Sequence, residues 1–550
     1  MKTREVVSGE KLRGGFYSPE ILVDLCLDRV AELVGSQDGL SFIEPAAGDG
    51  AFVRGLSQHV LGNRVSRFDA VEVLQEEAAK CSRALAAASF AGTVHSCNVL
   101  EWYEVGRRQY DVALGNPPYI RYQFISPDDR QRGTAISAGL GVPGPAVSNL
   151  WIPVFLLALD SLVDGGVFSM ILPTEFLTGV SAGRVRGWLL ENTRDLRIDL
   201  FQPGSFPAVL QEVLVLTGRK VRSREADNKV QFWDHNGGTK SWFHCISKHA
   251  QTWTAFLMEP SYVDAYHACL GLPEVVKLGE VARLSVSTVT GANDFFCVNT
   301  ETVEEYEMSE WAIPLLPRTR YAQGIEYSHS DHARLISSSV PAWLLSFSAD
   351  RRSPIGTRAW DYLMLGEQAG LHERYKCRIR EPWYRVPVVP PGELMMSKRS
   401  NKFPRVIANT DGVVTTDTIY RGSVNRRLAV TAHDIAAAFH NSLTLLSVEV
   451  EGRSFGGGVL ELVPSEISAV RLPLSAVAHQ QLPELDAISR GSSDEYDLVR
   501  TTDEYLPSWV PGLTPDLLQT IQEGRRELSS RRLTRGQAAF WSGDSTGDGQ

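Results

Sequence analysis

Short apolar runs alternate with amphipathic segments over the first 220 residues of the chain. An apolar run bounded by turn residues is typical of a buried strand, whereas apolar residues three or four positions apart indicate a helix. Alternating strands and helices indicate an α/β domain. The runs predict strands at 40–44, 68–73, 93–97, 110–115, 166–172, 197–201 and 213–219, and the amphipathic segments predict helices at 19–35, 51–61, 75–88, 149–163 and 181–192.

Four later regions have other patterns. Residues 120–148 are rich in Gly, Pro, Ser and Asp, and we expect a long mobile loop there. Residues 221–270, with three tryptophans, are expected to form a connector. Residues 271–491 combine short strand-like runs with many aromatics and frequent Pro and Gly, which predicts a mixed, β-rich domain. Residues 492–550 are predicted to be helical with a frayed polar end.

The composition is ordinary for a globular protein of two or three domains, with 550 residues, 43% hydrophobic and 22% charged. No apolar stretch reaches ~18 residues, so no membrane helix is expected. The N-terminus has no apolar signal-peptide core. The seven cysteines are scattered without a Cys-x-x-Cys pair, so neither a disulfide framework nor a zinc site is expected. These features favour a cytoplasmic protein without a bound metal.

Charge is distributed unevenly. The chain carries a net −10, yet residues 371–430 hold twelve Lys and Arg against five acids, a local net of +7. A basic patch on an acidic protein is typical of a site for a polyanion, and a solvated surface is the alternative. The candidates for contacts to nucleic-acid phosphates are Arg378, Arg380, Lys398 and Arg399.

The residues Asn116-Pro117-Pro118-Tyr119 directly follow the predicted strand 110–115. Each proline ring fixes φ and removes an N–H, so the turn is rigid and its carbonyls point in set directions. Asn116 adds a carboxamide oxygen that accepts hydrogen bonds, and Tyr119 adds a flat aromatic face. These groups suit a planar substrate with an NH₂ group: the Asn116 oxygen and the Pro117 carbonyl would accept its two N–H bonds while the tyrosine ring stacks on it. An ordinary strand-to-turn connection is the alternative.

Three other predicted strand ends carry groups that suit a nucleoside cofactor. Segment 44–52, Glu-Pro-Ala-Ala-Gly-Asp-Gly-Ala-Phe, joins a strand to a helix, and its small residues let a ligand approach the backbone. Glu72 ends the second strand, where a doubly wound sheet binds ribose hydroxyls. Asn98 follows the third strand and offers a donor and an acceptor to an adenine edge. Neither G-x-G-x-x-G nor G-x-x-x-x-G-K-[ST] is present, so a dinucleotide or a nucleoside triphosphate is not favoured.

With these motifs in this order, the chain resembles the class I S-adenosylmethionine-dependent methyltransferases. More narrowly, it resembles the gamma-class, adenine-specific DNA methyltransferases of type II restriction–modification systems. The resemblance implies a Rossmann-like catalytic domain with a seven-stranded mixed sheet at 1–220 and a connector at 221–270. It further implies a target-recognition domain at 271–491 and a C-terminal helical segment at 492–550. The family usually has Asp where this chain has Asn98, and that acid accepts from the adenine amine of the cofactor.

The resemblance also implies roles for particular residues. The tract 16–20 would touch the methionine end of the cofactor, and Asn116–Tyr119 would bind the target base. Tyr119 and Phe206, the latter in a Ser-Phe-Pro tract before the last predicted strand, would stack on the flipped base. The implied cofactor contacts are Ser18, Glu44, Ala46, Gly48, Gly50, Glu72, Asn98 and Val99.

The implied reaction moves a methyl group from S-adenosylmethionine to the 6-amino group of an adenine rotated out of duplex DNA. No metal is required, because the sulfonium already activates the methyl group. The implied partner is double-stranded DNA, and a separately encoded restriction endonuclease could accompany the enzyme in a restriction–modification or phage-defence system.

Three other functions fit part of the pattern. A methyltransferase acting on protein glutamine or on RNA is the main alternative, because a glutamine side chain also presents a planar NH₂. The large basic, aromatic C-terminal region favours nucleic acid, because a small amide substrate does not need it. A binding-only subunit is disfavoured by the intact Asn116–Tyr119 and Gly48–Gly50. A fused nuclease at 227–229, Asp-Asn-Lys, is disfavoured because it lacks an acidic partner upstream.

Overall fold

The chain divides into two units, unit 1 with Met1–Pro260 and Ala538–Gln550, and unit 2 with Ser261–Gln537. The computed structural model describes residues 18–106, 108–144, 147–179, 182–201, 212–236, 238–455, 458–475 and 477–541.

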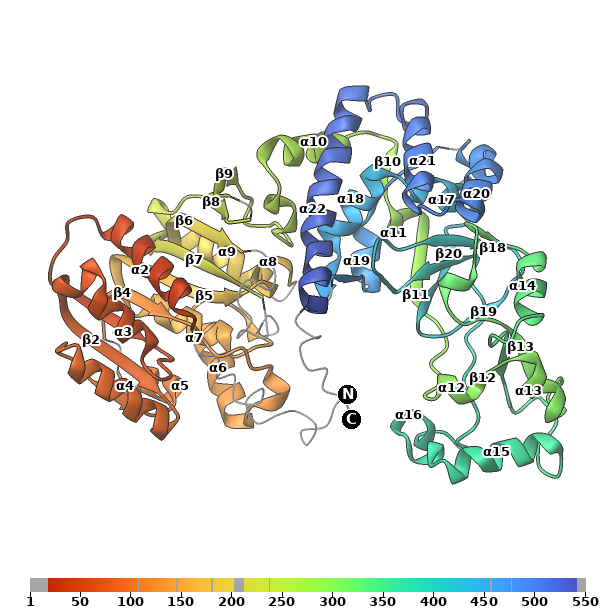
Figure 1. Cartoon of the computed structure of the whole chain (residues 1–550), viewed down its shortest axis with the longest axis horizontal. Helices are drawn as coiled ribbons and strands as arrows, with labels where there is room; N and C mark the ends of the chain where they lie inside the picture. The colour runs from red at the N-terminus through yellow and green to blue at the C-terminus, as the bar shows by residue number, and fades with distance from the viewer. Residues whose placement is uncertain are drawn as a thin grey trace. The chain divides into compact units, whose positions relative to one another are not determined.

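A nine-stranded sheet is the centre of unit 1, in the order β3-β2-β1-β4-β5-β7-β6-β8-β9 (Figure 1). Strands β3, β2, β1, β4 and β5 are parallel to their neighbours in this series, and β7 runs antiparallel to both β5 and β6. The first seven strands thus form the mixed Rossmann-like sheet that the sequence predicted, and β8 and β9 extend it. The strands are β1 Leu40–Glu44, β2 Val65–Glu72, β3 Val94–Ser96, β4 Tyr110–Gly115, β5 Leu162–Pro173, β6 Thr193–Leu200, β7 Val213–Lys220, β8 Lys229–Asp234 and β9 Lys240–Cys245.

Helices cover both faces of this sheet. Successive strand residues point to opposite faces, so Val167 and Phe168 of β5 belong to different layers. Val167 joins the apolar cluster formed with α2, α3 and α4, whereas Phe168 meets Phe155 of α7 edge to face at 5.9 Å. The helices of unit 1 are α2 Glu20–Val34, α3 Ala51–Gln58, α4 Gln75–Ala87, α5 Val99–Val105, α6 Pro127–Gly139, α7 Trp151–Asp160, α8 Glu175–Thr178 and α9 Gly183–Asn192.

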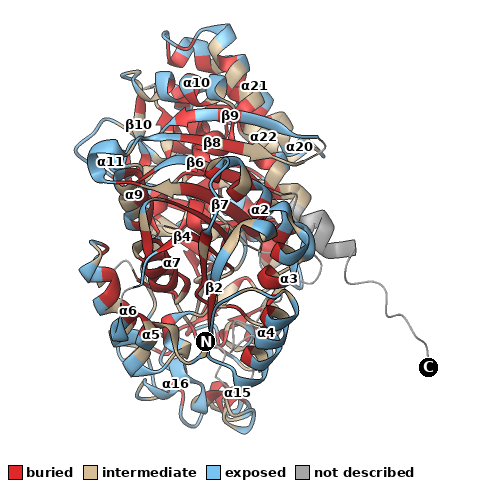
Figure 2. Cartoon of the chain, turned by 90° about the vertical axis from the view of Figure 1, so that its left-hand side faces the viewer, coloured by how far each residue is buried: buried red, intermediate tan, exposed pale blue. Residues whose placement is uncertain are grey.

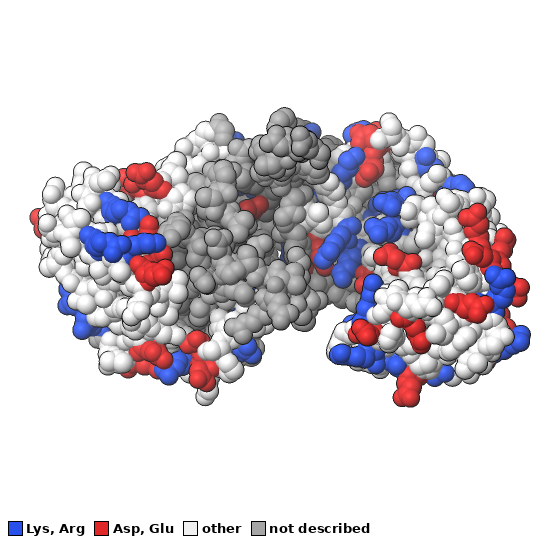
Figure 3. Space-filling model, turned by 60° about the horizontal axis from the view of Figure 1, so that its bottom comes forward, with Lys and Arg blue, Asp and Glu red and all other residues white. Residues whose placement is uncertain are grey.

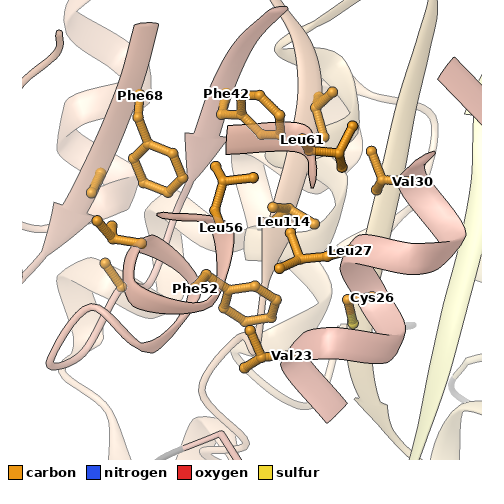
Figure 4. Close-up of a cluster of buried hydrophobic side chains, with 14 of the residues drawn as sticks. Val23, Cys26, Leu27, Val30, Phe42, Phe52, Leu56, Leu61, Phe68 and Leu114 are labelled. Atoms are coloured by element: carbon orange, nitrogen blue, oxygen red, sulfur yellow. The ribbon is translucent and has the colours of Figure 1, made fainter. Parts of the chain in front are cut away.

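The core on the α2–α4 side is built from the apolar stripes of those helices and the inward residues of the strands. Figure 4 shows Val23 and Leu27 of α2, Phe52 of α3 and Phe42 and Phe68 of the sheet directed toward one another. The Phe42 and Phe68 rings stack with centroids 6.1 Å apart. In Figure 2 the strands β4, β7 and β8 are largely buried while the outer surfaces of α3, α4 and α6 are exposed. Within residues 19–220, the observed strands and helices that the sequence predicted lie close to their predicted positions.

The prediction of a long loop at 120–148 is wrong, because Pro127–Gly139 forms α6. Its start follows the usual rules: Ser126 Oγ accepts from the Asp129 N–H at 3.0 Å, proline occupies the first helical position, and two acids lie in the first turn. One of the glycines that suggested a loop, Gly133, serves packing instead. A Cβ at Gly133 would lie 2.7 Å from the Tyr122 hydroxyl and 3.1 Å from Pro153 Cγ.

The division into units also differs from the predicted connector at 221–270. Strands β8 and β9 belong to the sheet of unit 1, with Phe232 paired to Trp242 and their rings stacked at 6.3 Å. These strands are short and carry polar residues on one face, so their apolar pattern is weak. The unit boundary falls after residue 260, which is the first residue of α10 Pro260–Leu270. The rest of this helix belongs to unit 2.

Unit 2 contains several small sheets with helices around them. The five-stranded sheet has the order β11-β20-β16-β18-β14, the four-stranded sheet β12-β15-β13-β19, the three-stranded sheet β17-β22-β21, and β10 pairs with β23. The strands are β10 Val275–Lys277, β11 Ala282–Val286, β12 Cys297–Val298, β13 Ala312–Leu316, β14 Glu326–Tyr327, β15 Trp343–Leu345, β16 Leu394–Ser397, β17 Arg399–Ser400, β18 Val406–Asn409, β19 Val414–Thr415, β20 Ile419–Val424, β21 Arg453–Phe455, β22 Val459–Glu461 and β23 Arg471–Pro473. The helices after α10 are α11 Leu278–Val281, α12 Asn293–Phe296, α13 Thr300–Glu305, α14 His329–Ile336, α15 Arg358–Gln368, α16 Tyr375–Arg378, α17 Ala432–Phe439, α18 Ser442–Glu451, α19 Pro464–Ala469, α20 Leu482–Gly491, α21 Tyr496–Trp509 and α22 Pro515–Trp541.

Helices α17 and α18 are buried along most of their length, and α22 supplies Arg532 to the same interior. The Arg532 guanidinium bonds the Glu449 carboxylate at 2.7 Å and the carbonyls of Lys402 and Gly458 at 2.6 and 2.5 Å. A buried charge of this kind is tolerated because every donor has a partner. Among the described residues, none of the helices combines the length and the apolar character needed to cross a bilayer.

Candidate active site and nucleic-acid interface

The carboxyl ends of the parallel strands of unit 1 bring the predicted site residues to one edge of the sheet. Glu44 ends β1, Glu72 ends β2, Asn98 follows β3, and Asn116 follows β4. Neighbouring parallel strands end at the same edge, which is where open α/β sheets bind ligands. A Cβ at Gly115, directly before Asn116, would lie 3.9 Å from Glu44 Cγ, so the β4 turn adjoins the β1 loop.

The loop between β1 and α3 has a conformation that glycine permits. Gly48 and Gly50 have φ values of +53° and +85°, in the left-handed region. The Gly48 N–H donates to Glu72 Oε2 at 2.9 Å, and the Ala47 N–H donates to the Val71 carbonyl at 3.0 Å, so the loop is tied to the end of β2. A Cβ at Gly48 would meet nothing within 4 Å. The Gly48 backbone therefore borders open space that a ligand can approach.

Three carboxylates surround this loop. Glu72 accepts a second N–H, from Leu74, at 2.9 Å through Oε1. Glu44 is only 2% exposed, and its Oε2 has no hydrogen-bond partner among the described residues. Burial raises the pKa of the Glu44 carboxyl well above its ordinary value, and the nearby Glu72 and Asp49 raise it further. A cationic ligand beside Glu44 would favour the ionised form of this carboxyl.

The Asn116 carboxamide is held from both ends. Its Nδ2 donates to Ser18 Oγ at 3.3 Å, and its Oδ1 accepts from the Tyr119 hydroxyl at 2.6 Å. The Tyr119 hydroxyl also lies 2.9 Å from the Ile171 carbonyl, and its ring packs against the core cluster. Burial raises the pKa of Tyr119 well above its ordinary value, so the hydroxyl stays protonated and can donate. Asn116 Oδ1 keeps a second lone pair for a substrate N–H.

The two prolines of this turn differ in surroundings. Pro117 is buried and Pro118 is half-buried. The Pro118 carbonyl accepts the Ile120 N–H at 3.1 Å. Both Ser18 and Tyr119 orient the Asn116 amide, and their predicted contacts with the cofactor and with the base stay predictions.

Asn98 has a partner that the sequence did not reveal. As the residue before α5, it caps the helix: Oδ1 accepts the Leu100 N–H at 2.9 Å. Its Nδ2 donates to Asp129 Oδ1 of α6 at 2.6 Å. Val99, the next predicted contact, is the first residue of α5 and half-buried. The cap sequence from Ser126 to Asp129 could have indicated a helix, but nothing in it indicates the contact with Asn98.

The predicted stacking residue Phe206 lies outside the described residues, as do Phe16 and Tyr17 of the tract before Ser18. Its role stays a prediction. In the described part of the chain, no group of three or more His, Cys, Asp or Glu side chains is arranged to hold a metal ion.

The basic residues predicted to contact DNA have unequal surroundings in unit 2. Arg380 donates to the carbonyls of Thr290 and Val289 at 2.6 and 2.7 Å, so its guanidinium is used in packing. Arg399 and Lys398 lie 2.6 and 3.9 Å from the Glu461 carboxylate, which offsets part of their charge. The sequence pattern of basic residues says nothing of these carbonyl and carboxylate partners.

The remaining candidate, Arg378, is exposed in the short helix α16. Around it lie exposed apolar side chains that the sequence analysis did not single out, Tyr375 at 65% and Ile379 at 62% exposure. Figure 3 shows groups of Lys and Arg side chains, interspersed with acids, on the visible face of unit 2. We call the exposed basic and apolar side chains of this stretch the 374–379 patch, made of Arg374, Tyr375, Lys376, Arg378 and Ile379.

Two family models match the chain, one within unit 1 and one that begins near the end of unit 1 and covers most of unit 2. The Eco57I restriction-modification methylase model matches residues 67–206, and the model of the C-terminal domain of type II methyltransferase M.Eco57I matches residues 250–506. Type II methyltransferase M.AccI of Acinetobacter calcoaceticus is 20% identical over 457 residues, which are 79% of this chain and 81% of that protein. Type II methyltransferase M.XamI of Xanthomonas campestris pv. amaranthicola is 22% identical over 372 residues, 66% of this chain and 67% of that protein.

The fold also resembles a solved structure. The DrdV protein in a DrdV–DNA complex aligns with a TM-score of 0.50 and 12% identity, covering 88% of this chain and 58% of that one. Two matches from one family lie in order along the chain and together cover more than half of it. The sheet of unit 1 and the strand-end residues fit these matches, and over both matched regions the chain is similar to the type II restriction–modification methyltransferases.

Proposed function

We propose that the chain transfers a methyl group from S-adenosylmethionine to the 6-amino group of an adenine in duplex DNA, as the modification enzyme of a restriction–modification or phage-defence system. The observation that carries this proposal is the Asn116 carboxamide. It lies at the end of β4, held by Ser18 and Tyr119, next to the open glycine loop after β1. A hydrogen-bond acceptor held next to a cofactor loop is what methylation of an amine requires.

The residues around the glycine loop fit this cofactor. Its sulfonium and ammonium charges outweigh its carboxylate, and Glu44 presents a buried carboxyl oxygen that has no hydrogen-bond partner in the described part of the chain. The open space at Gly48 leaves room for a ligand against the backbone. The two Glu72 oxygens each accept one N–H, which leaves lone pairs for ribose hydroxyls. When bound, S-adenosylmethionine would supply an electrophilic methyl group.

The chain's own task is then to prepare the amine. The lone pair of the adenine amine is delocalised into the ring, so the amine is a weak nucleophile. Asn116 Oδ1 and the Pro117 carbonyl would accept its two N–H bonds and favour a more tetrahedral nitrogen, whose lone pair points at the methyl group. Because the Tyr119 hydroxyl bonds the Asn116 oxygen, the orientation of this acceptor would already be set before the substrate arrives.

Access to the target base requires that it leave the duplex, at a cost of a few kcal/mol. We propose that Phe206 and the Tyr119 ring offset this cost by stacking, at ~1–3 kcal/mol per contact. Unit 2 would hold the duplex, with the 374–379 patch on the phosphates and groove edge. The match to the C-terminal domain of M.Eco57I supports this division. A cytoplasmic location and a separately encoded endonuclease remain predictions.

The test is methyl transfer to unmethylated mixed-sequence duplex DNA from radiolabelled S-adenosylmethionine, followed by digestion and chromatography of the nucleosides. We expect label in N6-methyladenine. Asn116→Ala should abolish transfer while cofactor binding, measured by calorimetry, survives, because the amide faces the substrate. Asn192→Ala is a matched control, since that amide bonds the Trp188 carbonyl at the end of α9, away from the ends of the parallel strands.

Each other result has a defined meaning. Label on cytosine would overturn the adenine assignment. No label on DNA, with label on RNA or on protein glutamine when these are offered in parallel reactions, would establish the alternative substrate instead. Near-normal activity of Asn116→Ala would refute the proposed role of the amide.

A further inference from the structure

Asn98 and Asp129 form a pair whose geometry assigns the atoms of the amide. Asn98 Oδ1 accepts the Leu100 N–H and Nδ2 donates to Asp129 Oδ1, at 2.9 and 2.6 Å. A flipped amide would lose both bonds, because it would set its NH₂ against an N–H and its oxygen against a carboxylate. The Asn98 oxygen therefore faces the N-terminus of α5. It keeps one lone pair there for a further donor.

The position of Asp129 is fixed independently of this bond. Its N–H and Oδ2 both bond Ser126 Oγ, at 3.0 and 2.8 Å, in the first turn of α6. Helix α6 packs on α5 and α7 through an apolar cluster of Leu100, Tyr103, Ile136 and Leu157. Arg132 of α6 also bonds Glu104 of α5 at 2.5 Å. Since these contacts already join the two helices, the Asn98–Asp129 bond is not needed to hold them together.

The pair lies where an adenine edge is expected. The strand ends in order carry a glycine loop after β1, a ribose acid at the end of β2 and Asn98 after β3. In a doubly wound sheet these ends form one continuous ligand crevice. A carboxylate that accepts from an amide N–H increases the electron density on the amide oxygen, because linked hydrogen bonds polarise one another.

We propose that Asp129 is a positioning residue that makes the Asn98 oxygen a committed acceptor for the 6-amino group of the cofactor's adenine. This inference rests on the proposed cofactor. Asp129 acts through Asn98 and does not touch the ligand. The pair would favour a nucleoside with a 6-amino donor over one with a 6-oxo acceptor, because the latter would face the amide oxygen.

The experiment measures the affinities of S-adenosylhomocysteine and S-inosylhomocysteine for the full-length protein by calorimetry. Asp129→Asn should weaken the binding of S-adenosylhomocysteine by up to about fivefold, which is the value of one neutral hydrogen bond from the adenine amine to an Asn98 oxygen that is no longer held in place. The affinity for S-inosylhomocysteine should stay unchanged or increase, because the Asn98 amide can then rotate and present its NH₂ to the 6-oxo group. Asp128→Asn is the matched control: this exposed acid lies one residue away in the same turn.

A swap of the two side chains sharpens the result. Asn98→Asp alone would set two carboxylates against each other and should lower stability. The double variant Asn98→Asp, Asp129→Asn restores one carboxylate and one amide, and should recover the preference for the adenosyl ligand. A merely structural role predicts equal losses for both ligands in Asp129→Asn.

If Asp129→Asn loses affinity equally for the two ligands, so that its preference matches that of the wild type, the inference is overturned while the cofactor assignment stands. Failure of the wild type to bind S-adenosylhomocysteine would instead refute the proposed cofactor. The two failures are therefore distinguishable in one set of titrations.

Discussion

Alanine should have different effects at Gly48 and Gly50, although the two glycines lie in one loop. Both have positive φ, so an alanine at either position costs about 1–2 kcal/mol in backbone strain. At Gly48 the added Cβ meets nothing within 4 Å, so strain is the whole cost. At Gly50 it would lie 3.0 Å from Cys81 Cα and 3.2 Å from Ala84 Cβ, and overpacking adds about 1–3 kcal/mol.

The free energy of unfolding should thus fall by about 1–2 kcal/mol in Gly48→Ala and by about 2–5 kcal/mol in Gly50→Ala. Ligand binding should show a separate effect. The Cβ of Gly48→Ala enters the open space assigned to the cofactor. The free energy of unfolding of the wild type should rise by about 2.7 kcal/mol with ligand at a hundredfold excess over its Kd, and that of Gly48→Ala should rise far less.

The assay is urea denaturation of unit 1 in the full chain, followed by the fluorescence of its tryptophans, with and without S-adenosylhomocysteine. Full ligand stabilisation of Gly48→Ala would refute the placement of the cofactor against this backbone. Equal stability of the two variants without ligand would refute the packing argument at Gly50.

Three further predictions follow from the same structural features. Burial raises the pKa of Glu44 in the folded protein, so the wild type loses stability as pH rises above the pKa of this carboxyl in the unfolded chain. Glu44→Gln does not titrate, so in urea denaturation it should stabilise the ligand-free protein more at pH 8 than at pH 5. Equal effects at the two pH values would contradict this. Tyr119→Phe keeps the ring but removes the bond to Asn116 Oδ1, so kcat for methyl transfer should fall about tenfold with little change in KM for DNA; a change confined to KM would show that the hydroxyl acts in binding. Charge reversal of Arg378 should reduce the salt slope of DNA binding by ~0.9 for each phosphate that the variant no longer neutralises, whereas Tyr375→Ala should weaken binding with the slope unchanged; no change in slope for Arg378 would place the duplex elsewhere.

The α/β part of the fold could be predicted because its elements are locally encoded. Strands such as Leu40–Glu44 and Tyr110–Gly115 are apolar runs that end in turn residues, and they lie where the pattern put them. Helix α6 was missed because its glycines and serines outweighed the cap at Ser126. The apolar contacts that make those small residues useful come from other elements, and a local pattern does not contain them.

The order of motifs indicated the similarity to type II methyltransferases and the edge of the sheet at which the proposed site lies. Parallel strands align their carboxyl ends, so Glu44, Glu72 and Asn116 had to meet once the strands were placed. The sequence also determined which chemistry these groups offer, because an amide oxygen accepts and a carboxylate carries charge in any fold.

Only the tertiary structure decided how those groups are used. Tyr119 turns its hydroxyl to Asn116, Arg380 donates to the carbonyls of Thr290 and Val289, and Asp129 reaches Asn98 across 31 positions. Each contact depends on the packing of elements that are distant in sequence, and a hydrogen bond requires placement to within a few tenths of an ångström. Sequence patterns specify which face of an element is buried, whereas the partner of a particular polar atom is set by the packed interior as a whole.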